Sequence, residues 1–199
     1  MIFDQANPAM RRSTKDAFIR DIMGRRPVYL DFHGGDWFAE VKTVFLYQGK
    51  KQNVTLYLAL EEDTIGSKWV FTNVYFEPFT KLFSPSDTRG GPDFIHPMSH
   101  ELDFMNLIKV FENQKAPEKY ANKYYQPDYL TLFLYEVKKG NLKFQTVSDT
   151  RFHFFQVENW YFEVSEFRRA DRNRGWLISQ MTRVPPGKKE LLLNFIYHQ

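Results

Sequence analysis

The stretch TVFLYQGKKQNVTL, residues 43–56, has the pattern of two strands joined by a polar turn. Apolar and polar residues alternate on both sides of QGKKQN, residues 48–53, and a glycine in such a turn is typical of a β-hairpin. The alternation begins at Trp37 and predicts a strand that ends at Tyr47. It places Glu40 and Lys42 on the outer side of that strand. The side chains predicted to share the inner side are Trp37, Ala39, Val41, Phe45 and Tyr47.

A similar stretch, TLFLYEVKKGNLKF, occupies residues 131–144 and matches the first at seven of fourteen positions. Farther along, WVFTNVYF at 69–76 aligns with WYFEVSEF at 160–167. This order favours an internal duplication of a helix-plus-meander unit. The alternative is that two hairpins of similar composition arose independently. Either interpretation predicts that residues 129–137 form a strand.

Helix signals precede each copy. Residues 13–24 carry Ser13 as a candidate N-cap and Gly24 as a stop, and a second helix is expected from Ser99 onward. The remaining expected strands are 54–60, 69–76, 142–147, 152–157 merging into 160–167, 176–183 and 191–197. The fold class is therefore α+β, mostly an antiparallel β meander with a few helices packed on the sheet.

The domain organisation follows from the same pattern. Residues 13–80 form a first helix-meander unit, and residues 97–199 form a second unit extended by two strands. The connecting loop at 81–96 is rich in Ser, Pro, Gly and Asp. The two units are also compatible with one compact domain.

The composition excludes several classes of protein. The chain has no cysteine, which removes thiolate nucleophiles and Cys-ligated zinc, and no apolar run reaches the length of a membrane helix. The formal net charge is only +3, which makes nucleic acid an improbable partner. A cytoplasmic location is expected if Met1 is the native start, and export if a leader has been removed.

Asp31 and His33 in LDFHGGDW are the candidate catalytic pair. Placed on one face of a short strand, with Asp36 just beyond a Gly-Gly turn, a carboxylate and an imidazole would orient a water molecule or hold a divalent cation. The alternative is a polar strand edge that enters a tight turn. No second cluster supplies further metal ligands, so no metal site and no cofactor are expected.

The other histidines give weaker signals. His96 and His100 lack the spacing of a zinc-binding helix, and Ser99 as an N-cap with Glu101 near the helix start explains that stretch without a ligand. His153 alternates with two phenylalanines in a strand, which is typical of a half-buried histidine with its hydrogen bonds satisfied. No phosphate-binding glycine loop and no G-x-S-x-G motif occurs.

Two further groups of residues are candidate binding sites. A basic cluster between two aromatic strands would hold phosphate or an acidic saccharide, or else forms a solvated hairpin tip. Its members are Arg168, Arg169, Arg172 and Arg174. Strand aromatics would line a surface for an apolar or saccharide ligand. Those expected at such a surface are Trp37, Tyr47, Trp69, Tyr135 and Trp160.

A capped helix followed by an aromatic antiparallel meander resembles the cystatin-like fold of the nuclear-transport-factor-like superfamily. The resemblance is one of element order over most of the chain. It implies a cone-shaped pocket, which in some members of that superfamily holds a catalytic Asp/His pair and in others only binds a ligand or partner. Here Asp31 with His33 is the pair that mimics the catalytic type.

Two functions follow as hypotheses. The favoured one is a non-catalytic module that binds a protein, a small molecule or a saccharide, and the alternative is a small isomerase or hydrolase that uses Asp31 and His33. The catalytic hypothesis requires both side chains to point into a cavity. Nucleic-acid contact through the arginine cluster ranks below both. A homodimer through an uncovered sheet face or edge is also plausible, because residues 160–167 are apolar on both sides.

Overall fold

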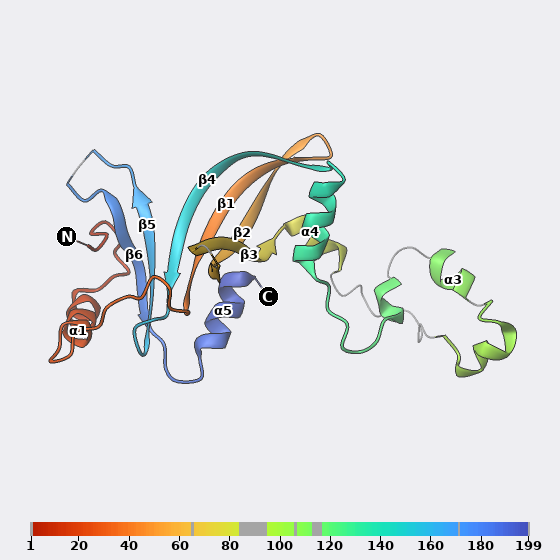
Figure 1. Ribbon diagram of the computed structural model, residues 1–199, viewed down its shortest axis with the longest axis horizontal. Helices are drawn as coiled ribbons and strands as arrows, with labels where there is room; N and C mark the ends of the chain where they lie inside the picture. The colour runs from red at the N-terminus through yellow and green to blue at the C-terminus, as the bar shows by residue number, and fades with distance from the viewer. Residues whose placement is uncertain are drawn as a thin grey trace. The chain divides into compact units, whose positions relative to one another are not determined.

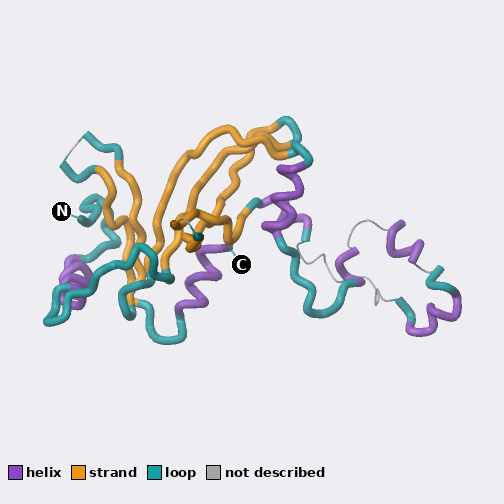
Figure 2. The backbone as a smooth tube through the Cα atoms, in the orientation of Figure 1, coloured by secondary structure: helices purple, strands orange, loops and turns teal. Residues whose placement is uncertain are grey.

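The computed structural model describes residues 2–64, 66–83, 95–105, 107–112, 117–170 and 172–198. The chain divides into two units (Figures 1 and 2). The first contains residues 1–75 and 130–199, and the second contains residues 76–129. The α+β fold class is confirmed, because the first unit is built on an antiparallel sheet with helices packed against it.

Six strands form the sheet in the order β3-β2-β1-β4-β5-β6, and every neighbouring pair is antiparallel. Their bounds are β1 Trp37–Tyr47, β2 Lys50–Asp63, β3 Gly66–Tyr75, β4 Leu142–Phe154, β5 Trp160–Phe167 and β6 Gly175–Arg183. The hairpin predicted for residues 43–56 is confirmed, but its turn is shorter than the expected 48–53, because residues 50–53 belong to β2. Its turn consists of Gln48 and Gly49, both with positive φ, as a two-residue β-turn of the primed type requires.

β4 is a single strand where two shorter ones were expected. Two register shifts opposite β1, between Lys42 and Thr43 and between Val44 and Phe45, interrupt the pairing without ending it. Such bulges insert extra residues and bend the strand. In Figure 1 the bent strands β1, β2 and β4 curve over α5.

The helices of the first unit are α1 Arg12–Ile22, α4 Tyr129–Lys138 and α5 Lys189–Tyr197. The α1 prediction is confirmed to within two residues, although its N-cap is Arg11 without a side-chain cap, and not Ser13. Residues 2–4 add a short parallel bridge to β6, where Phe3 pairs with Ile178. This bridge covers part of the β6 edge.

The predicted strands at 129–137 and 191–197 are wrong, because both segments are helices. In α4 the apolar residues Leu130, Phe133, Leu134 and Val137 recur at helical spacing, and the i, i+3, i+4, i+7 pattern outweighs the strand-like composition. Phe133 packs edge-on against Phe45. In α5 the pairs Leu192/Leu193 and Ile196/Tyr197 give the same periodicity and pack on the sheet.

The two similar sequence stretches therefore fold differently. Residues 43–56 form a strand, a turn and a strand, whereas residues 131–144 form most of α4, a turn at Gly140 and the start of β4. The duplication is not confirmed as a structural repeat. The shared letters are compatible with both structures because leucine, phenylalanine and tyrosine pack equally well on a helix and on a strand.

The sheet carries a different core on each side. On one side, Phe18 of α1 packs with Phe3, Trp160 and Phe162. On the other side, Phe38, Tyr57 and Tyr161 pack against α5. Because side chains alternate along a strand, neighbouring residues such as Tyr161 and Phe162 belong to opposite cores.

The second unit contains α2 Glu77–Leu82, the 3₁₀ turns η1 Pro97–Leu102 and η2 Pro117–Tyr120, and α3 Leu107–Glu112. The long helix expected from Ser99 is instead η1 followed by α3, with Asp103 and Phe104 in the left-handed region between them. Most of the predicted connecting loop, residues 84–94, lies outside the described residues.

Candidate functional site

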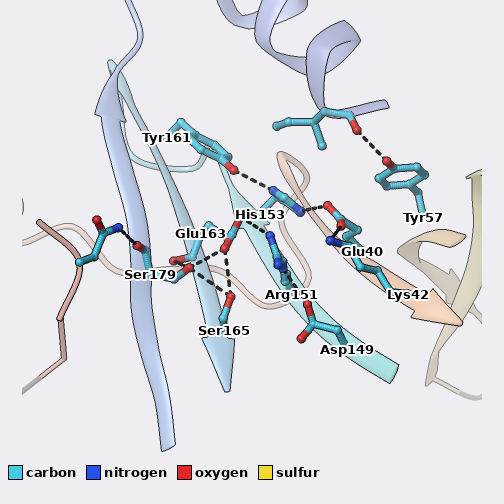
Figure 3. Close-up of polar contacts among 12 residues, drawn as sticks. Glu40, Lys42, Tyr57, Asp149, Arg151, His153, Tyr161, Glu163, Ser165 and Ser179 are labelled. Carbon is cyan, nitrogen blue, oxygen red and sulfur yellow. Dashed lines mark hydrogen bonds and ion pairs between the residues drawn. The ribbon is translucent and has the colours of Figure 1, made fainter. Parts of the chain in front are cut away.

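Charged side chains form a ladder on the side of the sheet that faces α5 (Figure 3). Lys42 pairs in register with Asp149 and Glu40 with Arg151, while His153 lies opposite Glu163 on the next strand. We call these residues the polar ladder: Glu40, Lys42, Asp149, Arg151, His153 and Glu163. Opposite charges across adjacent strands attract each other, so the ladder is built from favourable cross-strand pairs.

His153 lies at the centre of the polar ladder and is 1% exposed. Its Nε2 lies 3.0 Å from Glu40 Oε2, and its Nδ1 lies 2.9 Å from the hydroxyl of Tyr161. When the imidazole is neutral, a carboxylate at Nε2 requires the proton on that nitrogen, so Nδ1 accepts from Tyr161. Glu40, His153 and Tyr161 thus form one continuous hydrogen-bonded chain across three strands.

Electrostatics keep Glu40 ionised. Burial raises the pKa of Glu40, but the hydrogen bond from His153 and the nearby cationic side chains of Lys42 and Arg151 outweigh burial, so the net shift of its pKa is downward. Burial lowers the pKa of Arg151, while its hydrogen bond to Asp149 and three nearby carboxylates raise it overall. Both groups are therefore charged at neutral pH.

Glu163 anchors the other end of the ladder. Its Oε1 accepts from Ser165 at 3.0 Å and from Ser179 at 2.5 Å. Its Oε2 lies 3.7 Å from Arg151 Nη1, and Glu40 Oε1 lies 3.6 Å from Lys42 Nζ. Both distances are beyond a good hydrogen bond. Among the described residues, these carboxylate oxygens and cationic groups thus retain bonding capacity.

A cavity of about 400 Å³ lies between the polar ladder and α5. Glu40, Lys42, Arg151 and Glu163 contribute to the polar part of its lining. The α5 wall is mostly apolar and consists of Leu192, Asn194, Phe195 and Ile196, with His198 at the helix end. The cavity is therefore amphipathic, with ions on the sheet and hydrocarbon on the helix.

Tyr57 holds the helix over this cavity. Its hydroxyl donates to the carbonyl of Ile196 at 2.6 Å, and its ring meets Tyr197 edge-on at 4.7 Å. Burial, with a smaller contribution from Glu40, raises the pKa of Tyr57, and burial also raises the pKa of Tyr197. Both phenols therefore stay neutral and act as hydrogen-bonding apolar rings.

The predicted catalytic pair lies elsewhere. Asp31 and His33 are exposed on a loop and not on one face of a strand. Asp31 Oδ1 accepts the backbone N–H of His33, and His33 Nδ1 lies 3.0 Å from Ser67 Oγ. The amide of Gln156 fixes this loop through the carbonyls of Asp31 and Gly35. Neither side chain lines the α5 cavity, and the catalytic pair stays a prediction.

Asp36 is also separate from that pair. It forms an ion pair with Lys189 at the start of α5. Gly34 explains the tight turn, because a Cβ there would lie 2.9 Å from the Cβ of Asp31. The Gly-Gly sequence thus serves loop geometry.

The residues of the predicted aromatic ligand surface lie in four places. Trp37 and Trp69 pack edge-on at 5.4 Å on the side of the sheet away from α5. Tyr47 is partly buried at the far end of β1, and Tyr135 is exposed on α4. Trp160 is a core residue, 2% exposed, whose Nε1 donates to Asp21. Only Trp37 and Trp69 lie together.

The arginine cluster is partly neutralised within the chain. Arg168 forms an ion pair with Glu166, and Arg169 with Asp4. The hydrogen bond from Arg169 lowers the pKa of Asp4 in spite of burial. Arg172 and Arg174 are exposed and form no ion pair with the described residues. Two of the four guanidinium groups are therefore already paired with carboxylates of the chain.

The remaining histidines have local roles. His96 is the N-cap of η1 and accepts the N–H of Met98, while His100 contacts the carbonyl of Pro97. Ser99 is buried inside η1 and is not the N-cap, and Glu101 is exposed. Within the described ranges, no three His, Asp or Glu side chains are grouped so as to hold a metal ion.

Sequence reasoning missed the polar ladder. Glu40 and Lys42 were placed on an outer side, but that side is covered by α5, and Glu40 is 9% exposed. His153 was expected to be half-buried and is fully buried. A signal existed in two of the strands, since Glu40 and Lys42 in β1, and Asp149, Arg151 and His153 in β4, occupy alternate positions. Only the position of α5 makes this polar side an interior one.

Comparison of the chain with protein-family models, with curated proteins and with solved structures finds no match. In the part of the chain that the structure describes, no helix has the length and apolarity needed to cross a membrane. The resemblance to the nuclear-transport-factor-like superfamily therefore stays a prediction, and any function has to be inferred from the geometry of the site.

Proposed function

We propose that the protein is a non-catalytic module that binds a small zwitterionic molecule with an apolar body in the cavity between the polar ladder and α5. The observation that carries this proposal is an ionic floor opposite an apolar helix wall, in which the carboxylates are buried and the two cations are partly exposed. Burying charges is costly, and buried titratable groups gathered in a cavity are typical of functional sites. The cavity also falls in the size range of small-molecule pockets.

The charges of the lining favour a zwitterion over a simple ion. In the lining, the carboxylates Glu40 and Glu163 lie beside the cations Lys42 and Arg151, so a positive and a negative ligand group would each meet an opposite charge. A ligand carboxylate would pair with the planar donors of Arg151, and an ammonium with the carboxylate oxygens that lack a short hydrogen bond. Its apolar body would pack on Leu192 and Ile196.

A set of three probes tests the ligand class. L-Phenylalanine carries both charges, 3-phenylpropanoate lacks the ammonium, and phenethylamine lacks the carboxylate. A ligand that binds only the folded chain raises its melting temperature. We expect L-phenylalanine to raise it most in thermal unfolding, with binding heats that follow the same order. Equal responses to all three probes, or none, would overturn the proposal.

Arg151→Gln tests where the ligand binds. The variant should lose the response to L-phenylalanine and to 3-phenylpropanoate and keep that to phenethylamine. Arg168→Gln is the matched control, because Arg168 is an exposed arginine with a carboxylate partner outside the cavity. Equal loss in both variants would contradict binding at the polar ladder.

An isomerase or hydrolase is the second candidate, favoured by the chain Glu40–His153–Tyr161, in which a carboxylate orients an imidazole. Against it, both ring nitrogens of His153 are already engaged and the side chain is buried. An enzyme of this kind would convert its ligand, and His153→Gln would stop conversion. Mass spectrometry of the compounds bound to the wild type and to His153→Gln distinguishes the two functions. An enzyme would carry different compounds in the two proteins, and a binding module would carry the same compound in both.

A further inference from the structure

The side of the sheet away from α5 carries a band of aromatic rings. Its members, the aromatic band, are Trp37, Trp69, Phe152, Phe154 and Trp176. Trp37 stacks on Phe154 and meets Trp69 edge-on, each at 5.4 Å, and Phe152 contacts Trp176 at 5.2 Å. The rings are thus held in place by one another.

The band is incompletely covered by the described residues. Trp69 is 43% exposed and Trp176 is 50% exposed. On the same side of the sheet, the neighbouring Phe162 is buried beneath α1. One part of this side is therefore core and the other part is open. Contiguous exposed aromatic surface of this kind marks an interaction site.

The two exposed tryptophans belong to strands at opposite edges of the sheet, and both rings reach Phe152, Trp69 at 6.4 Å and Trp176 at 5.2 Å. β3 and β6 are the two edges of the sheet and run in opposite directions, because five antiparallel steps separate them. Trp69 lies near the start of β3 and Trp176 near the start of β6. The aromatic band therefore crosses the sheet from the β2–β3 turn to the β5–β6 turn.

Each end of the band, called a corner here, carries one charge without an ion-pair partner among the described residues, and these two charges are opposite in sign; Glu166, the register partner of Trp176, is paired with Arg168. Leu60 is the register partner of Trp69, so the two side chains lie on the same side of the sheet. Glu62 follows Leu60 by two residues, and side chains two positions apart in a strand point to the same side, so Glu62 lies on the side of Trp69. Arg174 precedes Trp176 by two residues. Glu62 and Arg174 are exposed, and neither has an ion-pair partner among the described residues. Their charged neighbours are paired: Lys68 with Glu61 and Asp63, and Arg168 with Glu166.

We propose that the aromatic band binds a second copy of this chain. In this dimer a twofold axis lies in the plane of the interface. It places the corner with Trp69 and Glu62 in each copy against the corner with Trp176 and Arg174 in the other copy. Such an interface must be self-complementary, so that residue i meets j and j meets i. The placement of one acidic and one basic corner at opposite edges of the sheet fulfils this condition and forms two equivalent Glu62–Arg174 ion pairs.

Sedimentation equilibrium over a range of protein concentrations tests the proposal. We expect a monomer–dimer equilibrium in the wild type. Glu62→Arg or Arg174→Glu alone places like charges together in both symmetric pairs and should weaken the dimer about tenfold or more. The double variant E62R/R174E restores opposite charges and should return the dissociation constant to within about threefold of wild type.

Controls separate this effect from unfolding and from general charge changes. Lys188→Glu and Glu158→Arg change exposed charges at the start of α5 and in the β4–β5 turn, and they should leave the dimer unchanged. Circular dichroism confirms that each variant is folded. A wild type that stays monomeric at every concentration overturns the proposal, as does a dimer that the single reversals leave intact or that the double variant fails to restore.

Discussion

The two sides of one sheet differ in what they bury. Along β1, Phe38, Glu40 and Lys42 point toward α5, and the alternate residues Trp37 and Ala39 point to the aromatic side. The first side buries the carboxylates Glu40 and Glu163, whereas the second leaves two tryptophan rings, Trp69 and Trp176, open to solvent. Folding stability alone would favour exposed charges and buried rings, since buried charges lose hydration and exposed rings lose apolar contacts. Each departure marks a surface with a further role.

On the aromatic side, a covered tryptophan can be compared with an open one. Trp160→Ala removes a ring that is 2% exposed and packed against Phe18, and it should lower the free energy of unfolding by about 3–5 kcal/mol. Trp176→Ala removes a half-exposed ring and should cost about 1 kcal/mol or less in the monomer. Urea unfolding at low protein concentration measures both. Equal losses would mean that both rings belong to one closed core.

On the polar side, Glu40→Gln keeps the shape and removes the charge. We expect a loss of about 1.5–3 kcal/mol at neutral pH, because the hydrogen bond to His153 loses its charged acceptor and Arg151 loses a carboxylate neighbour. Asp16→Asn, at an exposed carboxylate of α1, is the control and should change little. A loss no larger than that of the control would contradict a structural role for the ladder.

The pH dependence of that loss has a defined sign. The pKa of Glu40 is lowered in the folded chain, so its stabilisation is fully present above the usual glutamate value of about 4.3 and is lost as the pH falls through the lowered pKa. The difference between wild type and Glu40→Gln should therefore shrink on acidification. A difference that grows as the pH falls would show that the pKa is raised instead.

Tyr57→Phe tests the tether between the sheet and α5. The change removes the hydroxyl that donates to Ile196 and keeps the ring, so about 1 kcal/mol of stability should be lost. Amide hydrogen exchange should speed up in α5 more than in β5. Uniform acceleration across the unit would indicate that the hydroxyl stabilises the fold as a whole and does not hold the helix in particular.

The smallest effect on stability and on binding is expected in the loop that carries the predicted catalytic pair, Asp31 and His33. Asp31→Asn and His33→Ala change exposed side chains outside the α5 cavity, so the melting temperature and the binding of L-phenylalanine should stay unchanged within error. Calorimetry checks both. Loss of binding in either variant would return the catalytic pair to consideration.

Much of the sheet could be predicted because alternation is a local property. The strands from Trp37 to Tyr75 and from Trp160 to Arg183 follow two-residue periodicity and were placed correctly apart from their ends. α4 and α5 were missed because their apolar residues also suit a strand. In α4, the spacing of Leu130, Phe133 and Val137 is that of a helix and would have predicted one.

The candidate site could not be predicted to the same degree. Glu40, Arg151 and Glu163 belong to three strands, and their proximity depends on sheet order, which brings β1 beside β4. Their burial depends on a C-terminal helix that the sequence analysis assigned as a strand. Asp31 and His33 attracted attention because they are neighbours in sequence, but in space they share only a hydrogen bond between side chain and backbone.

Native mass spectrometry of three proteins in the presence of L-phenylalanine tests most directly whether the two sides act separately. The wild type should be a dimer with ligand bound, Glu62→Arg a monomer that still binds the ligand, and Arg151→Gln a dimer without it. A single substitution that removes both the second copy and the ligand would contradict the assignment of one role to each side.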